Sequence, residues 1–163
     1  MTGKRSTRPI SIAHGCDRFK TNNAMIWGLI PLEIKLSGDD TGGELLVFMH
    51  RNMTAKGGPP RHVHHDQDEW FYVVAGEFVA EIGDERFTMH TGDSLFAPRA
   101  VPHAWAHVGD MPGTIITTVS PVGSFETFIR DTTLLSTVPS EEEIVEAFSK
   151  HNMTIVGPPL AVN

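Results

Sequence analysis

Cysteine is almost absent from this chain of 163 residues, which contains only Cys16. A single cysteine cannot form an internal disulfide, and it cannot supply a zinc site built from thiolates or an iron–sulfur cluster. Any metal site that this chain forms by itself must therefore use nitrogen and oxygen ligands. The chain is long enough for one domain with a single hydrophobic core that needs no disulfide.

Basic residues are scarce relative to acidic ones. Thirteen lysines and arginines against twenty aspartates and glutamates give a net charge of −7. This charge repels phosphate groups, so we expect neither nucleic acid nor a membrane surface as a partner. Long apolar runs are absent too, since residues 24–30 fall far short of the roughly 18 residues that span a bilayer, and the basic N-terminus lacks a signal-peptide core. A cytoplasmic location is the expectation.

Short β-branched and aromatic runs fill the middle of the sequence. Between residues 44 and 120 they read ELLVFMH, EWFYVV, EFVAEI, ERFTM, SLFA, AWAHV and TIITTVS, separated by glycine, proline and aspartate. This regular alternation of short strands and turn residues predicts an antiparallel barrel or sandwich. Gly83 and Asp84 predict a two-residue hairpin loop. The segment EWFYVV has apolar residues on both faces of the predicted strand, so we expect both faces to be covered. The cover of the outer face would be a second subunit or the segment near Trp27.

A helix is predicted near the C-terminus, over residues 141–150. Ser140 and Glu143 fit a capping box at its start, and Ile144, Val145 and Phe148 are expected to form the apolar stripe that docks on the barrel. The chain then divides into three segments. These are a leader and covering segment (1–40), the barrel (41–131), and a C-terminal helix and tail (132–163).

The polar stretch RHVHHDQDEW carries a possible metal site. On a strand, residues two apart share a face, so His62 and His64 can point at one spot. Glu69 follows a short polar turn and begins the next predicted strand, so its carboxylate can return to that spot. A third imidazole has to come from elsewhere, and His103 begins another predicted strand. Three imidazoles and a carboxylate suit one divalent iron, manganese, nickel, cobalt, copper or zinc ion.

A surface turn is the simpler interpretation of a histidine-rich polar stretch, and His-x-His alone is a weak signal. The wider layout favours a metal site, because six of the nine histidines lie between residues 62 and 107. His14, His50, His90 and His151 have no partner at ligand spacing. We expect these four to be structural or surface residues.

Two motifs resemble those of the cupin family. His62-x-His64-x4-Glu69-x6-Gly76 is similar to the first cupin motif, and Gly92-x5-Pro98-x-Ala100-x2-His103 is similar to the second. The sequence segments around these motifs resemble those of small single-domain bacterial cupins of the quercetin 2,3-dioxygenase-like type. The resemblance implies an all-β double-stranded β-helix, or jelly-roll barrel, with a short C-terminal helix. It also implies a homodimer, and a metal bound by His62, His64, Glu69 and His103.

The sequence departs from the second motif at two positions. Ala100 stands where the motif usually has glycine, so we expect the turn before His103 to adopt a conformation that tolerates a Cβ. His107 stands where the motif often ends in asparagine. It is a hydrogen-bond donor behind the metal ligands, a substrate contact, or simply a polar group with satisfied hydrogen bonds.

The reaction implied by the resemblance is dioxygenation of a flavonol-like enolic or phenolic small molecule. Glu69 would be the base that removes the hydroxyl proton of the substrate. Strand parity predicts that Met49, Phe71 and Trp105, with His107, contact the substrate, although filling the barrel core is the simpler interpretation of each apolar residue taken singly. Two alternatives stay open because the cupin fold does not settle function. One is a cupin that only binds a small ligand as a sensor or carrier, and the other is a metal-dependent isomerase or lyase.

Overall fold

Two antiparallel sheets of five strands face each other in the computed structural model, which describes residues 4–21, 24–134 and 138–162. In spatial order, the first sheet consists of β12 (Met153–Pro159), β5 (Pro60–His64), β10 (His103–His107), β7 (Glu77–Ile82) and β8 (Glu85–His90). The second consists of β3 (Glu33–Leu36), β4 (Leu46–Met53), β11 (Gly113–Ser120), β6 (Asp68–Ala75) and β9 (Ser94–Ala97). The predicted jelly-roll barrel is confirmed.

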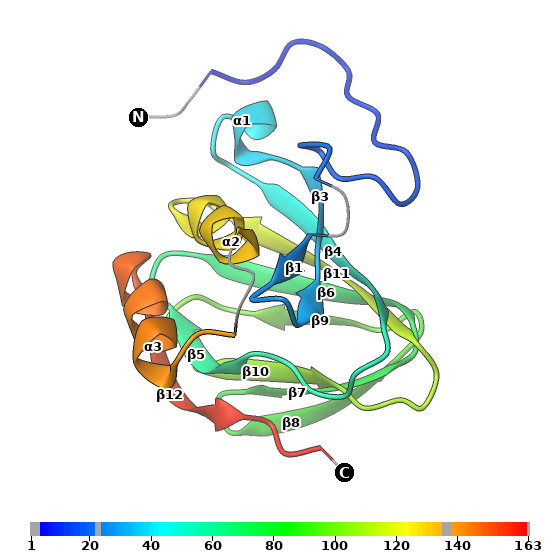
Figure 1. Cartoon of the computed structure of the whole chain (residues 1–163), viewed down its shortest axis with the longest axis vertical. Helices are drawn as coiled ribbons and strands as arrows, with labels where there is room; N and C mark the ends of the chain where they lie inside the picture. Colours follow the sequence, from blue (N-terminus) through cyan, green and yellow to red (C-terminus); the bar gives the residue numbers. More distant parts are fainter. Residues whose placement is uncertain (1–3, 22–23, 135–137, 163) are drawn as a thin grey trace.

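The described part of the chain also contains three helices and a small hairpin. The hairpin is formed by β1 (Met25–Ile26) and β2 (Ile30–Pro31), and the helices are α1 (Gly38–Thr41), α2 (Phe125–Thr133) and α3 (Glu141–Lys150). Helices α2 and α3 lie together at one end of the two sheets, with β1 beside them (Figure 1). Among the described residues, no helix is long and apolar enough to cross a membrane.

The helix predicted over residues 141–150 and the hairpin predicted at Gly83 and Asp84 are both present. The Ser140 amide donates to the Glu143 carboxylate over 2.7 Å, and the Glu143 amide donates to the Ser140 hydroxyl over 3.3 Å, so α3 begins with the expected capping box. Ile82 pairs with Glu85 across the two-residue loop. The apolar stripe of α3 is narrower than predicted, because Phe148 is buried but Val145 is 48% exposed.

Both sheets extend beyond residues 41–131. Strand β3 lies before this range and pairs with β4, and β12 lies after it and pairs with β5. Helix α2 crosses the boundary at residue 131. The predicted segment boundaries are therefore not where the sheets begin and end. Spacing along the sequence cannot reveal that distant edge strands join a barrel, because strand pairing is a tertiary contact.

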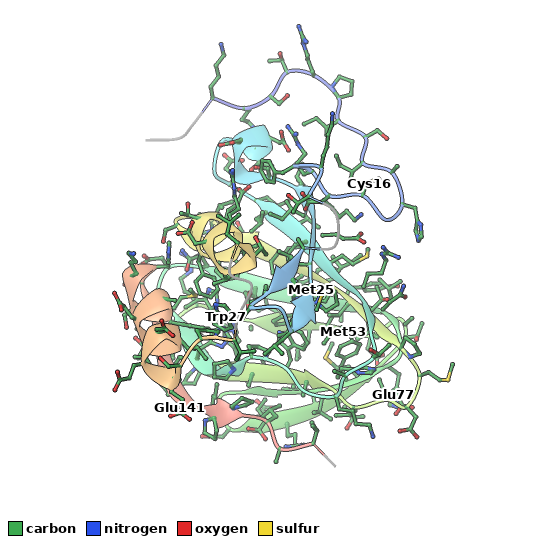
Figure 2. The ribbon with its side chains drawn as sticks, in the orientation of Figure 1. Cys16, Met25, Trp27, Met53, Glu77 and Glu141 are labelled. Atoms are coloured by element: carbon green, nitrogen blue, oxygen red, sulfur yellow. The ribbon has the colours of Figure 1, made fainter. Side chains whose placement is uncertain are left out.

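Buried and exposed side chains alternate along strand β6 as predicted, and Phe71 and Val73 are on the buried face. The described residues leave its outer face uncovered, since Trp70, Tyr72 and Val74 are each more than one third exposed. The expectation that the segment near Trp27 covers this face is wrong. Trp27 packs instead against Phe128 of α2 and Phe148 of α3, with ring centroids 6.1 and 6.2 Å away, at the end of the barrel (Figure 2).

Candidate metal centre

Four side chains converge between the two sheets: His62 and His64 from β5, His103 from β10 and Glu69 from β6. The histidines come from the first sheet and the glutamate from the second, so the cluster joins both layers of the barrel. One ligand atom from each residue lies within 4.8 Å of all the others, and all four side chains are buried. His103 pairs with His62 across the β10–β5 ladder, which brings the third imidazole to the first two.

Backbone carbonyls fix the orientation of two imidazoles. His62 Nδ1 donates to the Pro60 carbonyl over 2.7 Å, and His103 Nδ1 donates to the Val101 carbonyl over 3.0 Å. Because a carbonyl only accepts, the proton of each neutral ring lies on Nδ1 and the Nε2 lone pair faces the cluster. His62 Nε2 lies 3.0 Å from His64 Nε2, and His103 Nε2 lies 2.9 Å from Glu69 Oε2.

Burial and the neighbouring groups shift the pKa values of the cluster residues in different directions. Burial, together with repulsion from the neighbouring imidazoles, lowers the pKa of His62 to about 3, so this ring is neutral at physiological pH. Burial alone would raise the pKa of Glu69, but the surrounding histidines outweigh it and lower this pKa to about 2. Burial lowers the pKa of His103, yet its hydrogen bond to Glu69 leaves the pKa raised overall, so a bound cation would replace the proton held between these two groups. The donor set fits a divalent ion.

The turn before His103 keeps the two motifs in register. The Ala100 amide donates to the His64 carbonyl over 2.7 Å. Ala100 has a φ of 61°, in the left-handed region that glycine adopts most readily. The turn therefore accepts a Cβ, but in a conformation that favours glycine. The alanine occupies the conformation of a glycine, at a backbone cost of about 1 kcal/mol.

A cavity of about 190 Å³ opens beside His62 and Glu69. Its cover comes from the β1–β2 segment and from α2 and α3, including Trp27, Phe128 and Phe148. These aromatic side chains belong to elements outside the region of the two motifs. The wall on the barrel side consists of Phe48 and His50 of β4, Trp105 of β10 and Thr117 of β11. Two residues of the cluster, His62 and Glu69, therefore line a mostly apolar pocket.

Of the four predicted substrate contacts, the structure brings Trp105 to the cavity wall. Phe71 is in the barrel core, with its ring centroid 6.5 Å from that of His103, and is not part of the wall. Met49 is placed by strand alternation on the face of β4 opposite to His50. The prediction therefore assigned Met49 to the wrong face of the strand. The segment ELLVFMH has apolar residues on both faces, so the sequence gives no signal that distinguishes the inner face from the outer one.

The imidazole of His107 lies beside backbone carbonyl groups. It is fully buried, and its ring nitrogens lie 3.2 and 3.1 Å from the carbonyls of Ala55 and Met111. A Cβ on Gly113 would stand 2.5 Å from the His107 ring, which shows how tightly the imidazole packs there. His107 is not among the residues that line the cavity beside His62 and Glu69, and its contact with a substrate stays a prediction.

His50 is the functional candidate that the sequence did not single out. Its side chain is buried, and Nδ1 donates to the Pro31 carbonyl over 2.7 Å. The ring lies between Phe48 and Trp105, with centroid distances of 5.4 and 5.1 Å. Burial lowers the pKa of His50 to about 4. Pairing at ligand spacing could not find this residue, because it contributes to the pocket and not to the metal cluster.

The fold and the cluster together define a class: a jelly-roll barrel with a buried three-histidine, one-glutamate site that could hold a metal ion. Residues 49–119 match the model of the cupin domain. An RmlC-like cupin from Shewanella frigidimarina is structurally similar, with 26% sequence identity and a TM-score of 0.50 over 67% of this chain and 91% of that one. These findings support the cupin superfamily.

Two curated relatives match a shorter segment. An uncharacterized protein from Methanocaldococcus jannaschii is 28% identical over 65 residues, which is 40% of this chain and 52% of that protein. The protein SchB from Streptomyces halstedii is 30% identical over 61 residues, which is 37% of this chain and 44% of SchB. The chain thus spans about half the length of the curated relatives that it matches.

Proposed function

We propose that this protein is a metal-dependent cupin dioxygenase that acts on an enolic or phenolic small molecule, the class to which flavonols belong. One observation carries the proposal. Three imidazole nitrogens and a carboxylate oxygen converge, and two of these residues, His62 and Glu69, also line an apolar pocket, where a bound organic molecule would be next to the metal ligands. Nitrogen and oxygen ligands suit iron, manganese, nickel, cobalt, copper and zinc, and a divalent ion with open positions would hold a substrate oxygen beside dioxygen.

Each residue of the cluster has a role in this proposal. His62, His64 and His103 would hold the ion, and the Nδ1 hydrogen bonds of His62 and His103 fix the orientation of these two rings toward the cluster. Glu69 accepts the hydroxyl proton of the substrate. The neighbouring histidines hold the pKa of Glu69 at about 2, so Glu69 is a weak base, and a bound ion would supply the Lewis acidity that makes the substrate hydroxyl more acidic. The aromatic cover excludes water and orients the ring.

The proposed reaction needs no external reductant. The substrate loses its hydroxyl proton to Glu69 and supplies the electrons that reduce dioxygen. Both oxygen atoms enter the product as a bond of the enolic system breaks, and the proton returns to the product. The protein contributes orientation, proton transfer and a dry pocket.

Oxygen uptake tests the proposal. The protein, loaded in turn with each of the six metals, is given a panel of flavonols, phenols and enediols, and consumption of dioxygen is recorded. We expect uptake with at least one metal, loss of uptake in Glu69→Gln with part of the metal retained, and unchanged uptake in Glu85→Gln, whose side chain is exposed on β8. If no metal gives uptake, the dioxygenase proposal is wrong. Ligand binding without turnover would then favour a sensor or carrier, and anaerobic conversion would favour an isomerase or lyase.

We also propose that the protein is a homodimer that pairs through the outer face of β6 and β9. Trp70 and Tyr72 stack there with ring centroids 5.8 Å apart, and Phe96, opposite Trp70 in the ladder, is 55% exposed. Exposed apolar groups of this size mark contact surfaces, and a second copy offers the same surface in a symmetric pair. Light scattering should show a dimer that Trp70→Lys converts to a monomer. Val156→Lys, a control at an exposed position on β12 of the other sheet, should stay dimeric. A monomeric wild type would refute the proposal.

A further inference from the structure

The apolar pocket contains two polar groups that the metal cluster does not use. Thr117 is only 1% exposed, and its hydroxyl has no hydrogen-bond partner among the described residues. His50 is held through Nδ1 by the Pro31 carbonyl, so the Nε2 of the neutral ring is an acceptor. Both side chains line the cavity beside His62 and Glu69. A buried hydroxyl without a partner is costly, which makes Thr117 a candidate for contact with a ligand.

The strand register places these groups in line with the metal cluster. Val119 of β11 pairs with Glu69 of β6, and Thr117, two residues along β11, pairs with Phe48 of β4. His50 lies two residues beyond Phe48. Glu69, Thr117 and His50 therefore lie along a diagonal across the inner face of the second sheet, and diagonal neighbours on adjacent strands are about 7 to 8 Å apart. A ligand that touches the metal cluster at one end meets Thr117 next and His50 beyond it.

The volume of the cavity limits the size of this ligand. At about 190 Å³ the cavity is smaller than the 300 to 1,000 Å³ of typical pockets for drug-sized molecules. An apolar cavity of about 150 Å³ is known to take up benzene. The pocket thus has room for one substituted ring and not for the three rings of a flavonol, unless the cover of β1, β2 and the helices moves.

We propose that the pocket selects a single-ring phenolic or enolic substrate that carries a second hydroxyl group away from the metal-bound oxygen. That hydroxyl donates to His50 Nε2 or hydrogen-bonds to the Thr117 hydroxyl, and the ring lies against Trp105 and Phe48. This substrate class rests on the proposed dioxygenase function. The two polar groups nevertheless make a separate claim about binding, which can be measured without turnover.

Calorimetric titration of the zinc-loaded full chain without oxygen tests the claim. The probes are phenol, 1,4-dihydroxybenzene and 3-hydroxyflavone, and the variants are Thr117→Val and His50→Gln. Thr118→Val is the matched control, because Thr118 is the next residue on the same strand and faces the opposite side of the sheet. One added neutral hydrogen bond predicts that the wild type binds 1,4-dihydroxybenzene about 5-fold more tightly than phenol.

We expect this preference to disappear in Thr117→Val, to weaken in His50→Gln and to persist in Thr118→Val. The thermal midpoint of ligand-free Thr117→Val should not fall, since the substitution removes a hydroxyl without a partner. A preference that survives in Thr117→Val, tighter binding of 3-hydroxyflavone than of both single rings, or no binding of any probe would overturn the inference. Selective binding without oxygen uptake under any metal would leave the inference standing and refute only the dioxygenase proposal.

Discussion

His50 should make the stability of the protein depend on pH in a specific range. The pKa of this buried imidazole is about 4 in the folded protein, against 6.5 for an ordinary histidine. Below about pH 6.5 the unfolded chain therefore binds a proton that the folded protein rejects, so stability falls as the pH falls toward 4. At about pH 5, which is about 1.5 pH units below the ordinary histidine pKa, each unit costs about 1.36 kcal/mol. The loss of unfolding free energy attributable to His50 is then about 2 kcal/mol.

Urea unfolding of the metal-free protein at about pH 7 and about pH 5 measures this effect. His50→Gln removes the titrating group and leaves an amide that can still donate to the Pro31 carbonyl. The decrease in unfolding free energy between the two pH values should be about 2 kcal/mol smaller in His50→Gln than in the wild type. The comparison isolates His50, because the raised pKa of His103 and the lowered pKa of His62 affect both proteins alike.

His90→Gln is the matched control. His90 is exposed at the end of β8, so this variant should keep the pH dependence of the wild type. Equal losses in the wild type and in His50→Gln would refute the reasoning, since His50 would then titrate alike in the folded and unfolded chains. A larger loss in His50→Gln would refute it as well, because the sign would be reversed.

Three further predictions concern the turn, the pocket wall and the metal. Ala100→Gly should raise the unfolding free energy by about 0.5 kcal/mol in urea titrations, because relief of the left-handed strain exceeds the added entropy of the unfolded chain; a decrease would show that the alanine is not strained. Gly58→Ala should lower it by about 3 kcal/mol, because the new Cβ would stand 1.8 Å from the Trp105 carbonyl oxygen, whereas an unchanged midpoint would contradict that close contact. Bound metal, measured by elemental analysis after dialysis, should fall as the pH drops below about 6, because the pKa of His103 is raised and the proton that its ring takes up competes with the metal; full retention at low pH would contradict His103 as a metal ligand.

The sequence determined the four residues of the cluster because their placement depends mainly on local geometry. Alternation along a strand puts His62 and His64 on one face, and a short turn returns Glu69 to the same place. The residues around His103 repeat a recognisable motif, and the structure places its imidazole beside Glu69. The hairpin at Gly83 and the capping box of α3 were predictable for the same reason, since each depends on residues a few positions apart.

Only the tertiary structure decided the pocket. Its cover comes from Trp27, α2 and α3, which lie outside the two motifs and meet the barrel through contacts between distant segments. The inward parity of β4, which selects His50 over Met49, follows from its pairing with β11 and β3 and not from its own apolar sequence. Local spacing fixes which side chains point together along a strand, but long-range packing alone fixes which face becomes the wall of the cavity and how large that cavity is.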